Sequence, residues 1–338
     1  MKRQITFAGA CYDRTQALID GTVKPDGLEL NWLILHYPEI WRRMLNDYDF
    51  DASELSLSSY LIARSMGKPL IAIPVFPART FRHSYVFINN KSGITKPADL
   101  IGKKVGVADF QQTATVWMRG ILQHEYNVPL EEIQWFTWAK TRMEIELPKR
   151  YSIQALPPEK DPEEMLKTGE LDAVILAALF PSLLNGVPEA KRLFENYKDV
   201  EQAFYKKTKI FPIMHTVAMR EELWKEQPWI AVSLLKAFQQ AKEIAYERLV
   251  DLNAYKISLI WMRDRVAEQK AVVGDDPWAY GFEKNRHVLQ AIAGYLHEQG
   301  LIKKPLDVET AFAPNTLNLQ TENPTCYCDD AKSSAVTA

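Results

Sequence analysis

The stretch Pro77-Ala78-Arg79-Thr80-Phe81-Arg82-His83-Ser84 separates two short apolar segments. Leu70–Phe76 precedes it and Tyr85–Ile88 follows it, and both have the composition of buried strands. Two arginines and a histidine therefore stand at the end of a predicted strand, where open α/β sheets bind ligands. Arg holds a carboxylate with two hydrogen bonds, and His exchanges protons near neutral pH. The stretch predicts an anionic ligand beside a proton donor; the competing interpretation is a solvated basic turn.

Strand-like and helix-like segments alternate before this stretch. Ile5–Ala8, Leu28–Leu35 and Phe50–Leu55 read as strands. Pro38–Leu45 reads as a helix with Pro in its first turn, and a second helix ends at Gly67. This alternation predicts an α/β domain with a largely parallel sheet.

A second α/β unit is predicted from about 85 to 205. Its strands are expected at Lys104–Ala108, Ile133–Trp138 and Leu171–Leu176, with a helix over Ala114–Tyr126. The rest of the chain is mainly helical, with helices expected over Trp229–Leu249, Tyr255–Val266 and Lys284–Gln299, and a polar tail beyond Pro314.

Composition excludes several classes of partner and location. The 338 residues hold 41 basic and 43 acidic side chains, a net charge of −2, which argues against nucleic acid or an anionic membrane surface as partner. The first residues contain no apolar core of a signal peptide, and no run approaches the length of a membrane span. Cys11, Cys326 and Cys328 form no disulfide framework. We expect a cytoplasmic protein; its oligomeric state, including a homo-oligomer, stays open.

Common cofactor and metal motifs are absent. The chain has no GxGxxG, GxxxxGK[ST], GxSxG or HExxH sequence. Its six histidines are scattered, so we expect no cofactor and no metal site, although carboxylates distant in sequence could still assemble one.

Polar side chains recur instead at the ends of successive predicted strands. This shared position favours one ligand site over several unrelated solvated turns. For His215 the competing interpretation is a satisfied core histidine, and Trp117, Trp138 and Trp278 could either stack on an aromatic ligand or belong to the core. The candidates at strand ends are Tyr12, Asp13, Arg14, Glu54, Ser56, Arg79, Arg82, His83, Gln111, Thr113 and His215, with Trp117 beside them.

Several of these stretches resemble one family. They are Tyr12-Asp13-Arg14-Thr15, Pro25-Asp26-Gly27-Leu28, Glu54-Leu55-Ser56, Phe76-Pro77-Ala78-Arg79 with Phe81-Arg82-His83-Ser84, Trp117-Met118-Arg119-Gly120 and Phe211-Pro212-Ile213-Met214-His215. The chain resembles, over about residues 1–300, the 4,5-dihydroxyphthalate decarboxylase family of type 2 periplasmic-binding-protein-like proteins.

The resemblance implies an α/β fold of two lobes with a ligand cleft between them, each lobe a mixed sheet flanked by helices. Lobe 1 would comprise 1–84 plus 210–313, with a helical C-terminal part, and lobe 2 would comprise 85–209. Residues 314–338 would form a flexible tail. The chain would cross between lobes near Phe81–Tyr85 and Lys207–His215, which places His83 and His215 beside the cleft.

The resemblance also implies an activity, that of a carboxy-lyase in phthalate degradation. Such an enzyme converts 4,5-dihydroxyphthalate to 3,4-dihydroxybenzoate and carbon dioxide by protonating the ring carbon that carries the departing carboxylate. His83 or His215 would be the acid, and Asp13, Glu54 or the other histidine would accept the phenolic proton. Arg14, Arg79 or Arg82 would hold the remaining carboxylate. The other substrate-binding candidates are Tyr12, Ser56, Gln111, Thr113 and Trp117.

Two other functions stay open from the sequence. A solute-binding protein for an anionic aromatic or sulfonate ligand would use the same cleft, but it needs export or a lipid anchor. A cytoplasmic biosynthetic enzyme could act on a different carboxylate with the same scaffold. In each case the expected partner is a small molecule.

Overall fold

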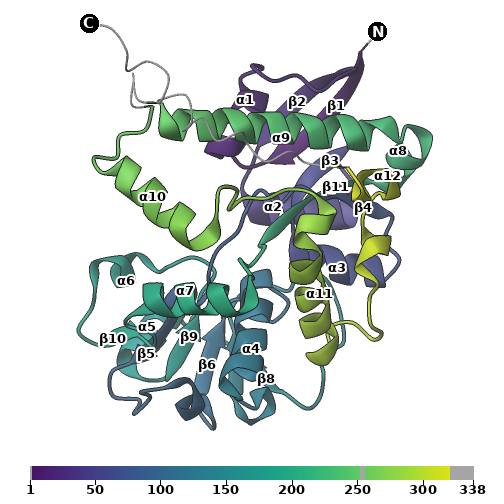
Figure 1. The fold of residues 1–338 in the computed structure, drawn as a ribbon. Helices are drawn as coiled ribbons and strands as arrows, with labels where there is room; N and C mark the ends of the chain where they lie inside the picture. The colour runs from purple at the N-terminus through teal and green to yellow at the C-terminus, as the bar shows by residue number, and fades with distance from the viewer. Residues whose placement is uncertain (1, 252–255, 320–338) are drawn as a thin grey trace, which may run out of the picture.

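The computed structural model describes residues 2–251 and 256–319. It contains two mixed β-sheets, one above the other in Figure 1, and each is flanked by helices. This is the expected α/β architecture of two mixed sheets. We call each sheet with the helices packed on it a lobe: lobe 1 holds the N-terminal strands and lobe 2 the middle of the chain.

The sheet of lobe 1 has five strands in the order β2-β1-β3-β11-β4. The strands β1, β2 and β3 run parallel, whereas β11 runs antiparallel to both of its neighbours. The central position of β3 explains why all of its residues are buried. The strands are β1 (Arg3–Gly9), β2 (Leu28–Ile34), β3 (Ala52–Ser56), β4 (Leu70–Ile73) and β11 (His215–Arg220).

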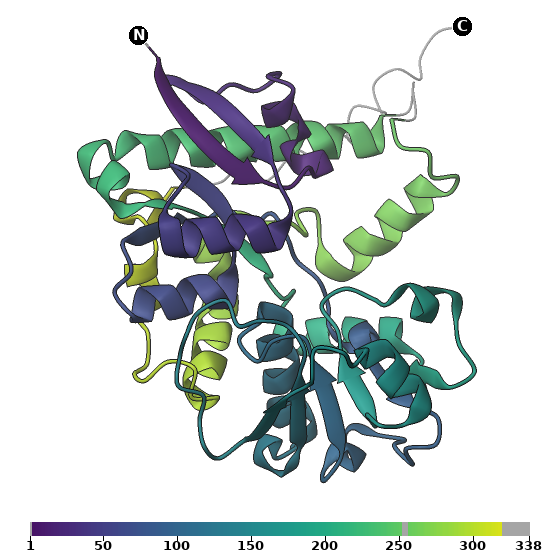
Figure 2. The same cartoon turned by 180° about the vertical axis from the view of Figure 1, so that it is seen from behind.

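Short helices follow the strands of lobe 1, and long C-terminal helices return to it. The longest, α9, lies across the outer end of lobe 1 and packs on α1 (Figure 2). The helices are α1 (Asp13–Ile19), α2 (Tyr37–Arg42), α3 (Leu57–Ser65), α8 (Glu221–Glu226), α9 (Trp229–Val250), α10 (Met262–Val273), α11 (Phe282–Glu298) and α12 (Pro314–Leu317).

The sheet of lobe 2 has six strands in the order β10-β5-β9-β6-β7-β8. The strand β5 is antiparallel to both neighbours, and the other pairs are parallel. The strands are β5 (Val86–Asn89), β6 (Lys104–Val107), β7 (Gln134–Thr137), β8 (Ser152–Ala155), β9 (Ala173–Ile175) and β10 (Ala190–Arg192). Its helices are α4 (Thr113–Tyr126), α5 (Pro162–Thr168), α6 (Pro181–Asn185) and α7 (Tyr197–Thr208).

Two extended segments connect the lobes and pair with each other. The backbone N–H of Thr80 donates to the Pro212 carbonyl at 3.1 Å, and that of Met214 donates to the Ala78 carbonyl at 2.8 Å. The rings of Phe81 and Phe211 stack with centroids 4.6 Å apart. The connection is therefore a short antiparallel ribbon, and both of its strands must bend together if the lobes move.

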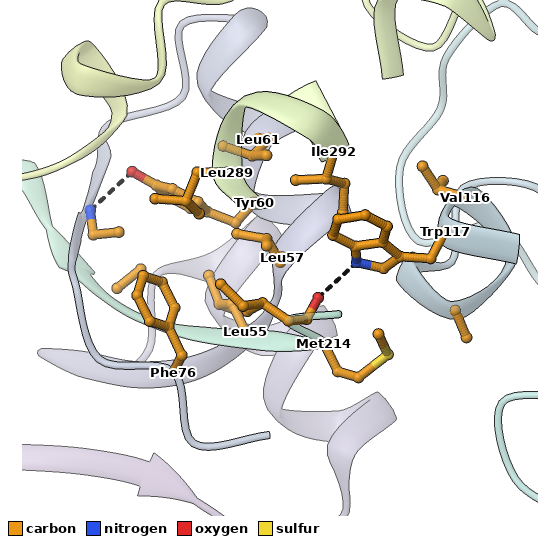
Figure 3. Packing of buried hydrophobic residues seen from close by; sticks show 14 of the residues in the cluster. Leu55, Leu57, Tyr60, Leu61, Phe76, Val116, Trp117, Met214, Leu289 and Ile292 are labelled. Carbon is orange, nitrogen blue, oxygen red and sulfur yellow. Dashed lines mark hydrogen bonds between the residues drawn. The ribbon is translucent and has the colours of Figure 1, made fainter. Parts of the chain in front are cut away.

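The lobes also touch through helices. The helix α4 of lobe 2 packs on α3 and α11, and the indole N–H of Trp117 donates to the Ile213 carbonyl at 2.9 Å (Figure 3). Gly120 permits this approach, because a Cβ there would overlap the ring of Tyr295 on α11. One large cluster of buried apolar residues consequently runs through both lobes.

Some expectations from the sequence need correction. The tail was expected from residue 314, but Pro314–Leu317 form α12 and Thr316 is fully buried. Asn315 donates to the Pro228 carbonyl, so this short helix is tied to the start of α9. The remainder of that tail, 320–338, lies outside the described residues. None of the helices in the described ranges combines the length and apolarity that crossing a bilayer requires.

Candidate functional site

A buried carboxylate in the central strand of lobe 1 organises the site. Glu54 on β3 is 2% exposed. Its Oε2 accepts the backbone N–H of Ala10 at 3.1 Å. Its Oε1 accepts the hydroxyl of Tyr12 at 2.6 Å and lies 2.5 Å from Nδ1 of His215. The loop after β1 reaches Glu54 because β1 and β3 are neighbouring parallel strands whose carboxyl ends share one edge.

The register of β3 and β11 brings Glu54 and His215 together. Glu54 lies opposite Val217, and side chains two residues apart on a strand point to the same face. His215 is thus the diagonal neighbour of Glu54 on that face, within reach of a long side chain. Because an ionised carboxylate only accepts hydrogen bonds, Nδ1 of His215 carries the hydrogen and Nε2 is left for a ligand.

Two tyrosines extend this hydrogen-bonded group. The hydroxyls of Tyr12 and Tyr37 are hydrogen-bonded to each other. Tyr12 gives its one hydrogen to Glu54, so Tyr37 must donate to Tyr12. Burial, followed by the nearby Glu54 charge, raises the pKa of Tyr12 and of Tyr37 far above the usual tyrosine range. Both phenols therefore stay protonated and act as donors.

An aromatic wall covers one side of His215. Tyr37 and Trp41 are four residues apart on α2, and their rings stack with centroids 5.3 Å apart. Both meet the His215 imidazole edge-on, at 4.9 Å and 5.3 Å. This wall fixes the ring plane and gives a planar ligand an apolar surface beside it.

Arg14 lies on the other side of Tyr12. Its guanidinium stacks on the Trp278 ring at 3.6 Å, pairs with Asp13 at 2.7 Å and donates to the Pro77 carbonyl at 3.0 Å. The Asp13 carboxylate is 48% exposed, unlike that of Glu54. Arg14 supplies positive charge next to the buried group, but two of its three nitrogens already have partners.

Side chains of α9 fix the loop that carries Trp278. Lys242 on α9 is fully buried and contacts the Asp276 carboxylate at 2.8 Å. Tyr246 donates to the same carboxylate and accepts the backbone N–H of Trp278 at 3.1 Å. These bonds fix the loop before α11, and through it the indole that stacks on Arg14.

Ser56, Gln111 and Thr113 join the lobes. The hydroxyls of Ser56 and Thr113 are 2.8 Å apart, and Thr113 also accepts the backbone N–H of Ser58 at 3.0 Å. Gln111 is fully buried: its backbone carbonyl accepts the Ser58 hydroxyl from lobe 1 at 2.6 Å, and its side-chain amide donates to the Met143 carbonyl at 2.8 Å. Ser56 lies opposite His215 in the sheet, and the hydroxyls of Ser56 and Thr113 serve contacts within the protein, whereas Oε1 of Gln111 is buried without a partner within the described residues.

His83 is not part of this group. It is fully buried among Tyr126, Phe194 and Phe204, and neither ring nitrogen has a partner within the described residues. Burial lowers the pKa of His83 to about 4. The structure therefore does not bring His83, one of the two candidates for the acid, to the Glu54 group, and its enclosed, uncharged imidazole is a weak acid near neutral pH.

Three other candidates make their contacts outside the Glu54 group. Arg79 donates to the Phe211 and Ala279 carbonyls and to Asn285, which ties the ribbon between the lobes to α11. Arg82 is 2% exposed, stacks on Tyr85 at 4.1 Å and lies against the carboxyl end of β9. Trp117 is fully buried in the core, as Figure 3 shows. Among the described residues, none of the three forms a hydrogen bond or ion pair with Glu54, Tyr12, Tyr37 or His215.

Sequence reasoning missed three residues that line the group: Tyr37, Trp41 and Arg142. The guanidinium of Arg142, from the loop between β7 and β8, lies 4.0 Å from the Trp41 ring. Arg142 follows the predicted strand Ile133–Trp138, but it comes four residues beyond the end of that strand, in a loop whose course the sequence does not predict. Tyr37 and Trp41 share one helical face, which was the available signal.

The described residues offer no group of three or more His, Cys, Asp or Glu side chains arranged for a metal ion. A cavity of about 680 Å³ lies elsewhere, lined by 64–66, 144–146 and 300–306. It includes no residue of the Glu54 group, so it does not define the site.

Comparison with known proteins identifies relatives by sequence. A protein of Comamonas testosteroni named 4,5-dihydroxyphthalate decarboxylase is 38% identical over 323 residues, which cover 94% of this chain and 98% of the relative. A protein of the same name from Pseudomonas putida is 33% identical over 212 residues, covering 61% of this chain and 82% of the relative. No family model matches the chain.

Solved structures support the fold alone. The aliphatic sulphonate binding protein SsuA of Escherichia coli has a TM-score of 0.53 at 14% identity, covering 94% of this chain and 99% of its own. A sulfonate-binding protein of Methylobacillus flagellatus has a TM-score of 0.57 at 15% identity, covering 93% and 92%. The desulfurization enzyme DSZB has a TM-score of 0.51 at 14% identity, covering 94% and 98%. One fold thus occurs in binding proteins and in an enzyme, so fold cannot decide between these functions. The sequence relatives decide the family: this chain belongs to the 4,5-dihydroxyphthalate decarboxylase family.

Proposed function

We propose that the protein is a carboxy-lyase that converts 4,5-dihydroxyphthalate to 3,4-dihydroxybenzoate and carbon dioxide. The observation that carries the proposal is the buried Glu54–His215 pair, 2.5 Å apart, at the strand edge where the lobes meet. The pair supplies an oriented imidazole for protonating the ring, a step that requires no electron-sink cofactor. Family membership supports the same reaction.

His215 is the proposed acid. Glu54 holds Nδ1, and Tyr37 and Trp41 fix the ring plane, so Nε2 is the atom that faces the substrate. For this step the imidazole carries a hydrogen on both nitrogens: Nδ1–H stays bonded to Glu54, and the proton on Nε2 passes to the ring carbon that carries the departing carboxylate. Electrons from the para hydroxyl move into the ring as its proton leaves, which gives a dienone. The carbon–carbon bond then breaks, carbon dioxide departs, and its electron pair restores the aromatic ring.

Asp13 is the proposed acceptor of the phenolic proton. Its carboxylate is half-exposed and adjoins Tyr12, whereas Glu54 is enclosed and already accepts three hydrogen bonds. The proton is returned to the oxygen when the ring becomes aromatic again. A positioned acid or base typically contributes roughly 10²–10⁴-fold to the rate.

The test is carbon dioxide release from 4,5-dihydroxyphthalate. The wild-type protein should release one equivalent, and His215→Asn should lower kcat roughly 10²–10⁴-fold while substrate still binds. His124→Asn is the matched control, because His124 also contacts a glutamate, Glu298, but on the surface. Full turnover by His215→Asn would remove His215 from the acid role. Tight binding without release of carbon dioxide from the wild type would instead favour a solute-binding protein.

A further inference from the structure

The described structure contains a second arginine beside His215, and it comes from the opposite lobe. Arg142 belongs to the loop between β7 and β8 of lobe 2, yet its guanidinium lies 4.0 Å from the ring of Trp41 in lobe 1. That same indole contacts His215 at 5.3 Å. Arg142 is thus one aromatic ring away from the proposed acid.

The hydrogen-bonding capacity of Arg142 is largely unused. Of its five N–H groups, one donates to Ser59 at a long 3.3 Å, and no other hydrogen bond of this side chain forms within the described residues. No carboxylate of the described ranges lies within ion-pair distance of it. Arg79 differs, because both terminal nitrogens of its guanidinium donate to Phe211, Ala279 and Asn285, although its buried Nε has no partner within the described residues.

The protein holds Arg142 in this place. Gln111 donates to the carbonyl of Met143, the next residue, at 2.8 Å, and Met143 is itself buried. The buried carboxylate of Asp109 attracts the Arg142 charge from the same side. Burial lowers the pKa of Arg142 to about 10, so the guanidinium remains charged near neutral pH. A partly desolvated cation with free donors is stabilised by an anionic ligand.

We infer that Arg142 is a substrate-binding residue: its planar fork, delivered by lobe 2, grips the carboxylate that stays on the ring while His215 protonates the neighbouring carbon. This assignment rests on the proposed function for the identity of the ligand. A cation bound to the departing carboxylate would stabilise its negative charge and so slow its conversion to neutral carbon dioxide. An arginine therefore aids the reaction when it binds the carboxylate that remains on the ring. The site is then complete only when both lobes contribute to it.

The first experiment compares two ligands that differ in charge but not in shape, 3,4-dihydroxybenzoate and 3,4-dihydroxybenzamide. Arg142→Ala should weaken binding of the acid roughly 10–100-fold, the range of a charge-assisted hydrogen-bonded pair, and should change amide binding less than about threefold. Arg142→Lys should fall between, because it keeps the charge and loses the fork. Lys140→Ala, which removes an exposed cation from the same loop, should leave both affinities unchanged.

The second experiment is kinetic. Arg142→Ala should raise KM for 4,5-dihydroxyphthalate by a similar factor and keep most of kcat, as expected when binding common to ground and transition state is lost. Equal weakening of acid and amide, or no change for either, would overturn the assignment. The ligand pair keeps this outcome separate from the proposed function. If the wild type releases no carbon dioxide, the proposed decarboxylation is wrong. If Arg142→Ala still loses affinity for the acid and not for the amide, Arg142 nevertheless binds the carboxylate.

Discussion

The two histidines next to the ribbon between the lobes differ in what surrounds them. His215 follows the second segment of the ribbon and meets a carboxylate and two aromatic rings. His83 follows the first segment and meets aromatic rings alone. The same residue type therefore serves a proposed proton transfer at one position and packing at the other.

His83 should make the protein less stable in acid. Its pKa is about 4 in the folded chain and about 6.5 when unfolded, so the unfolded state binds a proton first as pH falls. Uncharged His83 makes its full contribution to the free energy of unfolding above pH 6.5, and this contribution is lost between about pH 6.5 and 4. The loss amounts to on the order of 2 kcal/mol by pH 5. Urea unfolding at pH 8 and pH 5 measures it.

His83→Leu should remove that part of the pH dependence and keep decarboxylation. His36→Leu, at an exposed histidine, is the control and should keep the wild-type difference between pH 8 and pH 5. An unchanged pH dependence in His83→Leu would mean that the pKa of His83 does not differ between the folded and the unfolded chain.

The sequence marks Glu54 as a candidate for a physical reason. Glu54 stands in a strand-like stretch, and a carboxylate in a central strand needs several donors, which Ala10, Tyr12 and His215 provide. Arg142 could not be found this way, since its position depends on how a lobe 2 loop meets lobe 1. The burial of His83 likewise depends on rings more than 40 residues away in the chain.

At the scale of elements, the contact between α4 and α11 fixes how the lobes meet. Gly120 is the point of closest approach, and its missing side chain makes room for Tyr295. The Tyr295 ring in turn meets Trp117 edge-on at 5.6 Å and stacks on His124 at 5.0 Å.

Gly120→Ala should lower the free energy of unfolding by roughly 1–3 kcal/mol, because its Cβ would overlap ring atoms of Tyr295 that cannot move independently. Gly294→Ala on α11 is the matched control. It meets nothing within 4 Å, so the better helix propensity of Ala should raise stability by up to about 1 kcal/mol. Chemical denaturation compares the two, and a loss of equal size in both would show that the helix contact is not the cause.

Element prediction from the sequence succeeded where periodicity was strong. The helices α9 and α11 and the buried strands β6 and β9 lie close to their expected places. The strand β8 escaped prediction because it is an edge strand with largely exposed side chains, and β10 because two of its three residues are the basic Lys191 and Arg192. Neither shows an apolar pattern that sequence analysis could use.

At the scale of the whole molecule, the continuous core predicts cooperative unfolding. The large apolar cluster includes Phe7 of lobe 1 and Val105 of lobe 2, and α4 and α11 bridge them. Thermal unfolding should therefore occur in one transition, with calorimetric and van't Hoff enthalpies agreeing. A scan with two resolved transitions would mean that the lobes melt separately. Binding of 3,4-dihydroxybenzoate should raise the single Tm.

The arrangement of lobes was accessible from sequence only through resemblance. Local patterns indicate alternating strands and helices, but they do not say that residues 215–220 pair with both β3 and β4. That pairing joins segments about 150 residues apart, and no local propensity encodes it.

The placement of β11 has a consequence for how the chain is made. On the ribosome β3 and β4 emerge long before the strand that must lie between them, while every strand of the second sheet is complete by Arg192. The middle of the protein can thus assemble during translation, but the N-terminal sheet keeps two facing edges unpaired until about residue 220 is synthesised. Such edges pair readily with other chains. Nascent polypeptides that stall before this point are the species that most need a chaperone.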